Sequence, residues 1–149
     1  MRSKAPLVLI EQMIMLLVFA LAAALCLQAF VKADGISMQG ENRSYAVVAA
    51  QNAAEVIRHS GGSMEHALSK AADRLGAQYG ENGLDLYYDA EWLETAEEGR
   101  YHLTAQGLLT EVPGLCKALI QVKDTEGMEE EGKLLFEIEV AWQEVGFHE

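Results

Sequence analysis

Apolar side chains dominate one long stretch near the start of the chain, from Leu7 to Val31. Between Met13 and Leu27 the only polar side chain is the thiol of Cys26, and the stretch holds no proline or glycine. At 1.5 Å of rise per residue, a helix of this length matches a hydrocarbon layer of ~30 Å. Because a lone spanning segment must satisfy its own backbone hydrogen bonds, the pattern predicts a transmembrane helix over 7–31.

A second helical pattern follows a possible break at Asp34-Gly35. Apolar or small side chains recur at steps of three and four residues over 41–59, which predicts a helix with one buried stripe. The stripe consists of Tyr45, Val48, Ala49, Ala53, Val56 and Ile57. Gly61-Gly62 ends this helix, and Ser63 is the expected N-cap of a shorter one. The sequence leaves open whether the first helix continues through Asp34-Gly35.

From Leu84 onward the hydrophobic period changes to two, which is typical of strands with one buried face. Four alternating segments cover residues 84–92, 101–109, 116–122 and 134–142. The expected inward positions are Leu84, Leu86, Tyr88, Ala90, Trp92, Tyr101, Leu103, Ala105, Gly107, Leu109, Cys116, Ala118, Ile120, Val122, Leu134, Phe136, Ile138, Val140 and Trp142. Short connections between the segments favour an antiparallel four-stranded meander with one wet face.

The dry face of this meander needs a cover, and the helix over 41–59 is the obvious one. We therefore expect Trp142, Phe136 and Ile138 to pack against Val48 or Val56. The predicted fold class is α+β, with a long N-terminal transmembrane helix followed by a soluble domain that contains the antiparallel four-stranded meander packed on a helix.

The charges are divided unevenly along the 149 residues. Residues 1–31 hold only Arg2, Lys4 and Glu11, a net charge of +1, so the total of −12 leaves −13 for residues 32–149. Such an acidic domain is poorly suited to phosphate backbones, and we expect no nucleic-acid partner. Because both leading basic residues precede the helix, we expect a single-pass protein of the cytoplasmic membrane with its N-terminus in the cytoplasm and its domain outside.

Glu11 does not fit a plain membrane anchor. A carboxylate within hydrocarbon costs roughly 2.5–3.5 kcal/mol of insertion free energy on insertion scales. We therefore expect a charged or polar partner that offsets this cost. One interpretation places Glu11 near the cytoplasmic interface, within reach of water and of Arg2 or Lys4. The other interpretation comes from the residues around Glu11.

The segment Leu7-Val8-Leu9-Ile10-Glu11, followed by a long apolar helix, resembles the start of a type IV pilin or type II secretion pseudopilin. The likeness covers about the first thirty residues. It implies a short basic leader over 1–6, cleaved between Pro6 and Leu7 by a prepilin peptidase, and Glu11 as the assembly residue that neutralises a neighbour's N-terminal amine. Pro6 stands where the family usually has glycine, and Leu7 where it usually has phenylalanine.

The resemblance implies a structural subunit, similar to a minor pilin, of a type IV pilus, type II secretion or competence-type filament. Its partners would be membrane lipid and other pilin-like subunits, and its extracytoplasmic α+β domain would span 32–149. Two other interpretations stay open. One is an uncleaved single-pass anchor carrying a binding or accessory domain that forms no filament. The other is a removable secretory signal, although Glu11 and Gln12 interrupt its apolar region.

No residue pattern points to catalysis, so we predict a protein that is not an enzyme, with no catalytic residue and no cofactor. His59, His66, His102 and His148 are scattered, without the spacing of zinc ligands. Cys116 falls on the apolar side of a strand, as expected for packing, while Cys26 lies in the membrane run, so no intramolecular disulfide is expected.

The segment from Asp124 to Gly132 is rich in carboxylates, which suit a hard cation such as calcium. Some pseudopilins bind calcium in a C-terminal loop. The segment lacks the spacing of an EF-hand, and acid-rich loops are usually just solvated. The sequence leaves calcium binding open, and no residue is assigned as a metal ligand.

Overall fold

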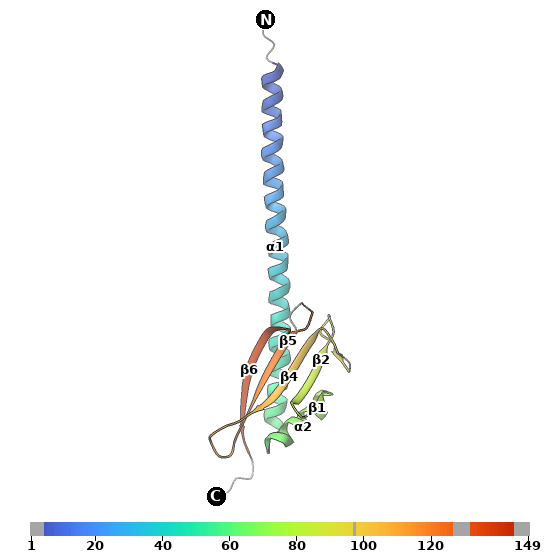
Figure 1. The fold of residues 1–149 in the computed structure, drawn as a ribbon, viewed down its shortest axis with the longest axis vertical. Helices are drawn as coiled ribbons and strands as arrows, with labels where there is room; N and C mark the ends of the chain where they lie inside the picture. Colours follow the sequence, from blue (N-terminus) through green and yellow to red (C-terminus); the bar gives the residue numbers. More distant parts are fainter. Residues whose placement is uncertain (1–4, 97, 127–131, 145–149) are drawn as a thin grey trace. The chain divides into compact units, whose positions relative to one another are not determined.

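The computed structural model describes residues 5–96, 98–126 and 132–144. The chain divides into two compact units, Met1–Glu41 and Asn42–Glu149. The helix α1 (Ala5–Ser60; Figure 1) contributes residues to both units and is unbroken at Asp34-Gly35. Helix therefore continues from the apolar run into the segment over 41–59.

Two glycines in the left-handed region end α1, since Gly61 has φ +60° and Gly62 has φ +78°. The next helix, α2 (Met64–Leu75), begins at the predicted cap, where the Ser63 side chain accepts a hydrogen bond from the backbone N–H of His66 at 3.4 Å. It ends at Gly76, which is also left-handed. The helix boundaries expected from the sequence here are confirmed.

The sheet of the C-terminal unit is antiparallel throughout. Its strands are β1 (Gln78–Gly80), β2 (Gly83–Tyr88), β3 (Glu94–Thr95), β4 (Tyr101–Leu108), β5 (Leu115–Asp124) and β6 (Lys133–Gln143). The order is β1-β2-β4-β5-β6, and β3 pairs with β2 beyond the end of β1. The described residues thus form six strands rather than the predicted four. The two additional strands are too short to show an alternating pattern.

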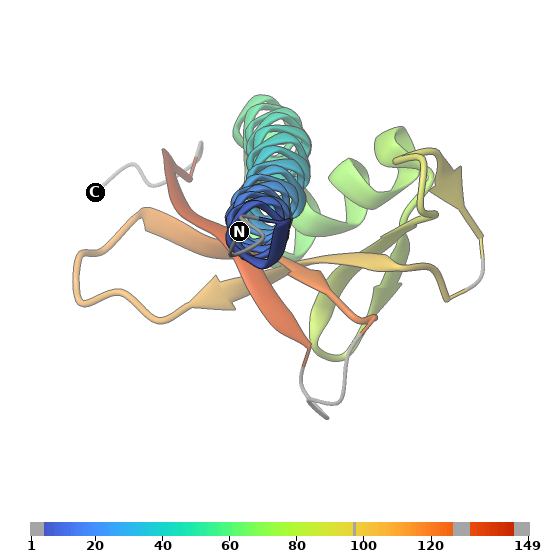
Figure 2. The same ribbon diagram turned by 90° about the horizontal axis from the view of Figure 1, so that it is seen from above.

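One face of this sheet is covered by residues 42–60 of α1 together with α2 (Figure 2). The residues of α1 that reach the core are mostly small: Ala46, Ala50, Ala53, Ala54 and Ile57. The predicted stripe is therefore partly wrong, because Tyr45 is 48% exposed and Val48 is 64% exposed. Small residues face the sheet since they let the helix approach it closely, and the larger residues lie outside that contact.

The inward faces of the strands follow the predicted alternation over most of their length. Confirmed buried positions are Leu84, Leu86, Tyr88, Tyr101, Leu103, Ala105, Cys116, Ala118, Ile120, Val122, Val140 and Trp142. The alternation of buried residues stops before the predicted ends, because β2 ends at Tyr88 and the last buried residue of β4 is Ala105. The positions that are exposed instead are Ala90, Gly107 and Leu109.

The last strand departs from simple alternation near its start. A register shift between Val122 and Lys123 of β5 pairs Val122 with Phe136 but Lys123 with Leu134. The extra residue turns Leu134 outward, where it is exposed, contrary to the prediction. Phe136 and Ile138 are partly buried against the core, as is Val56 of α1.

Candidate functional site

The first candidate site is the apolar surface of α1 itself. Every residue from Pro6 to Val31 is exposed. By its length and composition this helix is suited to cross a membrane. A signal sequence near an N-terminus meets the same criteria of length and composition. Exposed apolar surfaces of this size are unusual for soluble monomers and are typical of membrane or protein interaction sites.

Glu11 lies on this surface without a partner in its own helix. The side chains one turn away, which could contact it, are Leu7, Val8, Ile14 and Met15, and all four are apolar. Its carboxylate makes no hydrogen bond or ion pair within the described residues. Arg2 and Lys4, which one interpretation placed near Glu11, lie outside that part of the chain.

The predicted processing residues lie at the very start of α1. The helix begins at Ala5, so Pro6 occupies its first turn, where proline is well tolerated. Leu7 is exposed and precedes Glu11 by four residues, about one helical turn. The peptide bond between Pro6 and Leu7 is therefore one turn away from the carboxylate assigned to assembly.

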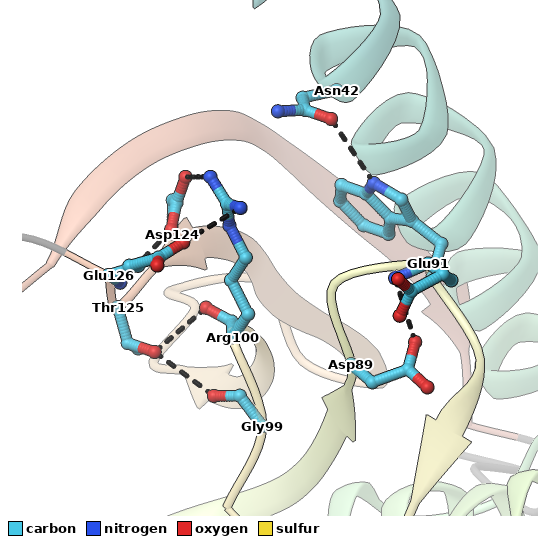
Figure 3. A network of polar contacts seen from close by, with 9 residues as sticks. Asn42, Asp89, Glu91, Gly99, Arg100, Asp124, Thr125 and Glu126 are labelled. Carbon is cyan, nitrogen blue, oxygen red and sulfur yellow. Dashed lines mark hydrogen bonds and ion pairs between the residues drawn. The ribbon is translucent and has the colours of Figure 1, made fainter.

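The second candidate site surrounds Arg100 in the loop before β4 (Figure 3). Its guanidinium contacts Glu126 (Nη1 to Oε2, 2.7 Å) and Asp124 (Nη2 to Oδ2, 3.4 Å). Burial lowers the pKa of Arg100, but the hydrogen bond and charge of Asp124 outweigh it, so the pKa lies above its ordinary value. The Arg100 guanidinium also lies 5.2 Å from the ring centroid of Tyr101.

These contacts bear on the segment considered for calcium. Asp124 and Glu126, its first two acids, already neutralise Arg100, and the Thr125 hydroxyl donates to the backbone oxygens of Gly99 and Arg100. Glu129, Glu130 and Glu131 lie outside the described residues. Over residues 5–96, 98–126 and 132–144, no group of three His, Cys, Asp or Glu side chains is placed to hold a metal ion.

Trp92 joins this region to α1. Its ring stacks on Tyr101 with centroids 3.9 Å apart, and its Nε1 donates to the side-chain oxygen of Asn42 at 3.5 Å. The backbone of Trp92 has φ 63°, which is rare for a residue other than glycine. Asp89 holds this turn, because its carboxylate accepts from the backbone N–H groups of Glu91 and Leu93, both at 2.9 Å.

The prediction that placed Trp92 inside a strand is therefore wrong. An aspartate whose side chain accepts hydrogen bonds from backbone two residues on builds a turn in place of a strand. Asp89, directly after the aromatic pair that ends β2, is the signal that would have located this turn. Trp92 fixes the loop against α1 through its stack on Tyr101 and its hydrogen bond to Asn42. We assign these three residues a structural role.

The histidines lie apart from one another in the described chain. His102 Nε2 is 2.8 Å from Asp85 Oδ1, and its ring stacks on Tyr87 with centroids 4.4 Å apart. His59 Nδ1 is 2.9 Å from the backbone oxygen of Glu55 in its own helix. His66 is exposed on α2, and His148 lies outside the described residues.

Cys116 is buried in β5 and its sulfur lies 4.0 Å from the backbone oxygen of Gly62. Burial raises the pKa of the Cys116 thiol, and the charge of Glu144 adds to this effect. A thiol held in its protonated form is a poor nucleophile, so the structure supports the packing role predicted for it. Cys26 lies on the exposed apolar surface of α1.

The two candidate sites thus differ in kind. In the Arg100 region both carboxylates, Asp124 and Glu126, contact the arginine, whereas the apolar surface of α1 carries one carboxylate that pairs with no described residue. Comparisons with protein-family models, curated protein sequences and solved structures give no match for this chain.

Proposed function

We propose that this chain is a structural subunit, of the minor pilin or pseudopilin kind, that joins a filament through the helix surface over 7–31. The observation that supports this proposal is Glu11, the single carboxylate on the exposed and mostly apolar stretch over 7–31. Retaining an acid at this position is costly in lipid, by roughly 2.5–3.5 kcal/mol. A neighbouring subunit that offers an ammonium group would offset this cost.

In this proposal the ammonium is the free amine of Leu7 in a neighbouring subunit, created when residues 1–6 are removed. Leu7 and Glu11 are one turn apart on the same helix. A small axial shift between two parallel helices therefore brings the amine of one to the carboxylate of the other. The domain over 32–149 lies outside the cytoplasmic membrane and forms the exposed part of the filament.

The test is a pair of adjacent substitutions in the full chain. Glu11→Ala leaves the neighbour's amine unpaired in an apolar bundle, which costs roughly 3–5 kcal/mol. At ~1.4 kcal/mol per tenfold, association between copies should fall by two to three orders of magnitude. Gln12→Ala removes the adjacent polar side chain and serves as the matched control, for which we expect normal association.

The measurement is cross-linking between α1 helices of differently tagged copies in membranes, compared with the amount of protein in the membrane fraction. Normal membrane levels with lost association of Glu11→Ala support the filament subunit. Undiminished association would point to a membrane-anchored accessory domain, because Glu11 then acts only as an insertion penalty. N-terminal sequencing that begins at Met1 would also contradict the proposal, since no amine would exist at Leu7.

A further inference from the structure

Two hollows lie on the side of the C-terminal unit where α2 and β1 are neighbours (Figure 1). Their volumes are ≈ 470 Å³ and ≈ 400 Å³, within the range of about 300–1,000 Å³ that small-molecule sites occupy. Glu65 of α2 and Tyr79 of β1 line both hollows, so the two are adjacent. We call them the α2–β1 hollows.

Two glycines allow the elements around these hollows to pack closely on β4. Gly83 begins β2 at φ +119°, and a Cβ there would clash with the backbone oxygen of Ala105 in β4. A Cβ on Gly107 of β4 would crowd the Met64 side chain of α2, at 2.9 Å from its Cγ. The β1-β2 hairpin and α2 are therefore both set against the same strand, and the shape of the hollows follows from the fold.

The α2–β1 hollows are lined mainly by polar side chains that have no partner in the described chain. The side chain of Ser63 is an exception, because it accepts the capping hydrogen bond of α2. The lining side chains without a hydrogen bond or ion pair to any described residue include Glu65, His66, Tyr79, Glu81, Asn82 and Gln106. These groups can all bond to a ligand without breaking a contact inside the protein.

The chemistry of this lining selects among polar ligands. Glu65 and Glu81 are carboxylates, and no lysine or arginine of the described chain lines either hollow, so an anionic ligand is disfavoured. Asn82 and Gln106 each carry a donor and an acceptor in one amide. An ammonium group, which only donates, would leave the amide donors unused, whereas a hydroxyl group both donates and accepts. The lining therefore suits a neutral ligand with several hydroxyl groups.

Tyr79 adds a flat apolar surface to these polar groups. Its side chain is 44% exposed, and its ring stacks on no other aromatic ring of the described chain. An aromatic ring of this kind offers an apolar face together with a polar hydroxyl tip. A sugar ring has C–H groups on its faces and hydroxyl groups around its edge, so it matches a surface that combines an aromatic face with amides and carboxylates.

We propose that the α2–β1 hollows bind a neutral saccharide, with one sugar ring packed on Tyr79 and its hydroxyl groups bonded to Glu65, Asn82 and Gln106. Two adjacent hollows fit two linked sugar rings, one in each. The site belongs entirely to the unit Asn42–Glu149, so this inference goes beyond the proposed function and does not depend on it.

The first experiment measures saturation-transfer difference NMR on the full chain in micelles of a detergent without a sugar head group. The probes are lactose, maltose, cellobiose and N,N′-diacetylchitobiose, each added separately. We expect saturation transfer to at least one of them, and a loss of affinity of about tenfold or more in Tyr79→Ala. Tyr45→Ala, at a tyrosine of similar exposure on α1, is the matched control and should keep the signal.

Two results of this experiment would overturn the proposal. One is the absence of saturation transfer to all four disaccharides. The other is a signal that Tyr79→Ala leaves unchanged, because the sugar would then bind elsewhere. Since Tyr79 is exposed, Tyr79→Ala should keep the melting temperature of the full chain, which shows that a lost signal is not a lost fold.

The second experiment converts amides to acids of the same size. Asn82→Asp and Gln106→Glu remove an amide donor, so each should weaken binding of the disaccharide about threefold to tenfold. Asn52→Asp makes the same change at an exposed position of α1 and should have no effect. Tetralysine is the competing probe, since an added carboxylate would strengthen the binding of a cation. Binding of tetralysine in place of the disaccharides, tightened by Asn82→Asp, would overturn the proposal.

The saccharide site and the filament subunit can fail separately. Tyr79→Ala should leave the cross-links between α1 helices unchanged, and Glu11→Ala should leave saccharide binding unchanged. If Glu11→Ala abolishes association while no disaccharide binds, the filament subunit stands and the saccharide site is wrong. If a disaccharide binds through Tyr79 while Glu11→Ala associates normally, the saccharide site stands and the filament subunit is wrong.

Discussion

The two ends of α1 use side chains of opposite size for opposite purposes. In the apolar run, Leu16 and Phe19 are 65% and 74% exposed. In the part that covers the sheet, Ala50 and Ala53 are 0% and 1% exposed. In these two pairs the larger residues are the exposed ones and the smaller residues are the buried ones, although Ile57 in the covered part of the helix is also 0% exposed.

This comparison shows that hydrophobicity and burial report different things. Burial within the chain requires another element at close range, and the sheet provides one for residues 46–57. The apolar run is exposed along its described length from Pro6 to Val31. Strong hydrophobicity without burial is therefore a property of a segment whose length and composition suit a membrane span.

The largest effect is expected from a cavity in the sheet core. Leu103 is 0% exposed, so Leu103→Ala should lower the free energy of unfolding of the domain by about 2–5 kcal/mol. Leu16→Ala removes the same atoms from the apolar run and should leave the unfolding of the domain unchanged. Urea denaturation of the full chain in detergent micelles measures both. Equal losses for the two variants would contradict the division between the two ends of the helix.

An alkaline pH dependence is expected from Tyr88, which is buried at the end of β2. Burial, with a smaller contribution from Glu94, raises the pKa of Tyr88 from 10.0 to about 12. Because the unfolded chain loses this proton more readily, stability is fully present below pH 10 and is lost as the pH rises to about 12. At ~1.36 kcal/mol per pKa unit the loss approaches about 3 kcal/mol.

Tyr88→Phe tests whether Tyr88 causes this loss of stability. Without the phenol, the unfolding free energy should depend less on pH between pH 10 and about 12. Tyr79→Phe, at an exposed position, is the control and should leave the slope as it is. The slope from pH 10 to 12 is to be followed by denaturation at each pH. If Tyr88→Phe keeps the full slope, other groups are responsible for it.

Enlarging an alanine side chain should have different effects in the covered part and in the exposed part of α1. Ala50→Leu forces additional atoms between α1 and the sheet, which typically costs about 1–3 kcal/mol. Ala23→Leu makes the same change on the exposed apolar surface and should leave the melting temperature of the domain unchanged. A neutral Ala50→Leu would show that the helix does not approach the sheet as closely as the structure places it.

The smallest effect is expected at the Arg100 cluster. Asp124→Asn removes one of two carboxylates from a partly exposed arginine, and surface ion pairs contribute roughly 0.2–1 kcal/mol. The loss of stability should shrink further at high salt, because exposed charges are screened. Parallel urea titrations at low and high salt measure this, with Glu98→Gln as a control nearby. A loss independent of salt would contradict an ionic origin.

The sequence predicts the strands well where burial alternates strictly. In β5 the residues from Cys116 to Val122 alternate without exception, and each predicted inward residue is buried. Prediction fails where a tertiary contact overrides the local pattern. The short strands β1 and β3 form because both pair with the edge of β2. The residue pattern of such short segments does not indicate this pairing.

The helix stripe fails for a different reason. Tyr45 and Val48 are the more hydrophobic choices near the start of the segment, yet Ala46 and Ala50 face the sheet. Packing distance selects small residues there, and a pattern weighted by hydrophobicity misses them. Glu11 is the reverse case, since the sequence alone shows that a carboxylate interrupts an apolar run, while no described residue pairs with it.

The two tryptophans have an optical consequence. Trp92, stacked on Tyr101, and Trp142, whose Nε1 donates to the backbone oxygen of Gly62 at 3.0 Å, are the only ones in the chain. Both belong to the sheet-bearing unit, and the apolar run contributes only phenylalanines to the aromatic residues. Fluorescence excited at the red edge of the indole band therefore reports on the sheet-bearing unit alone, even in detergent or lipid, without any label attached.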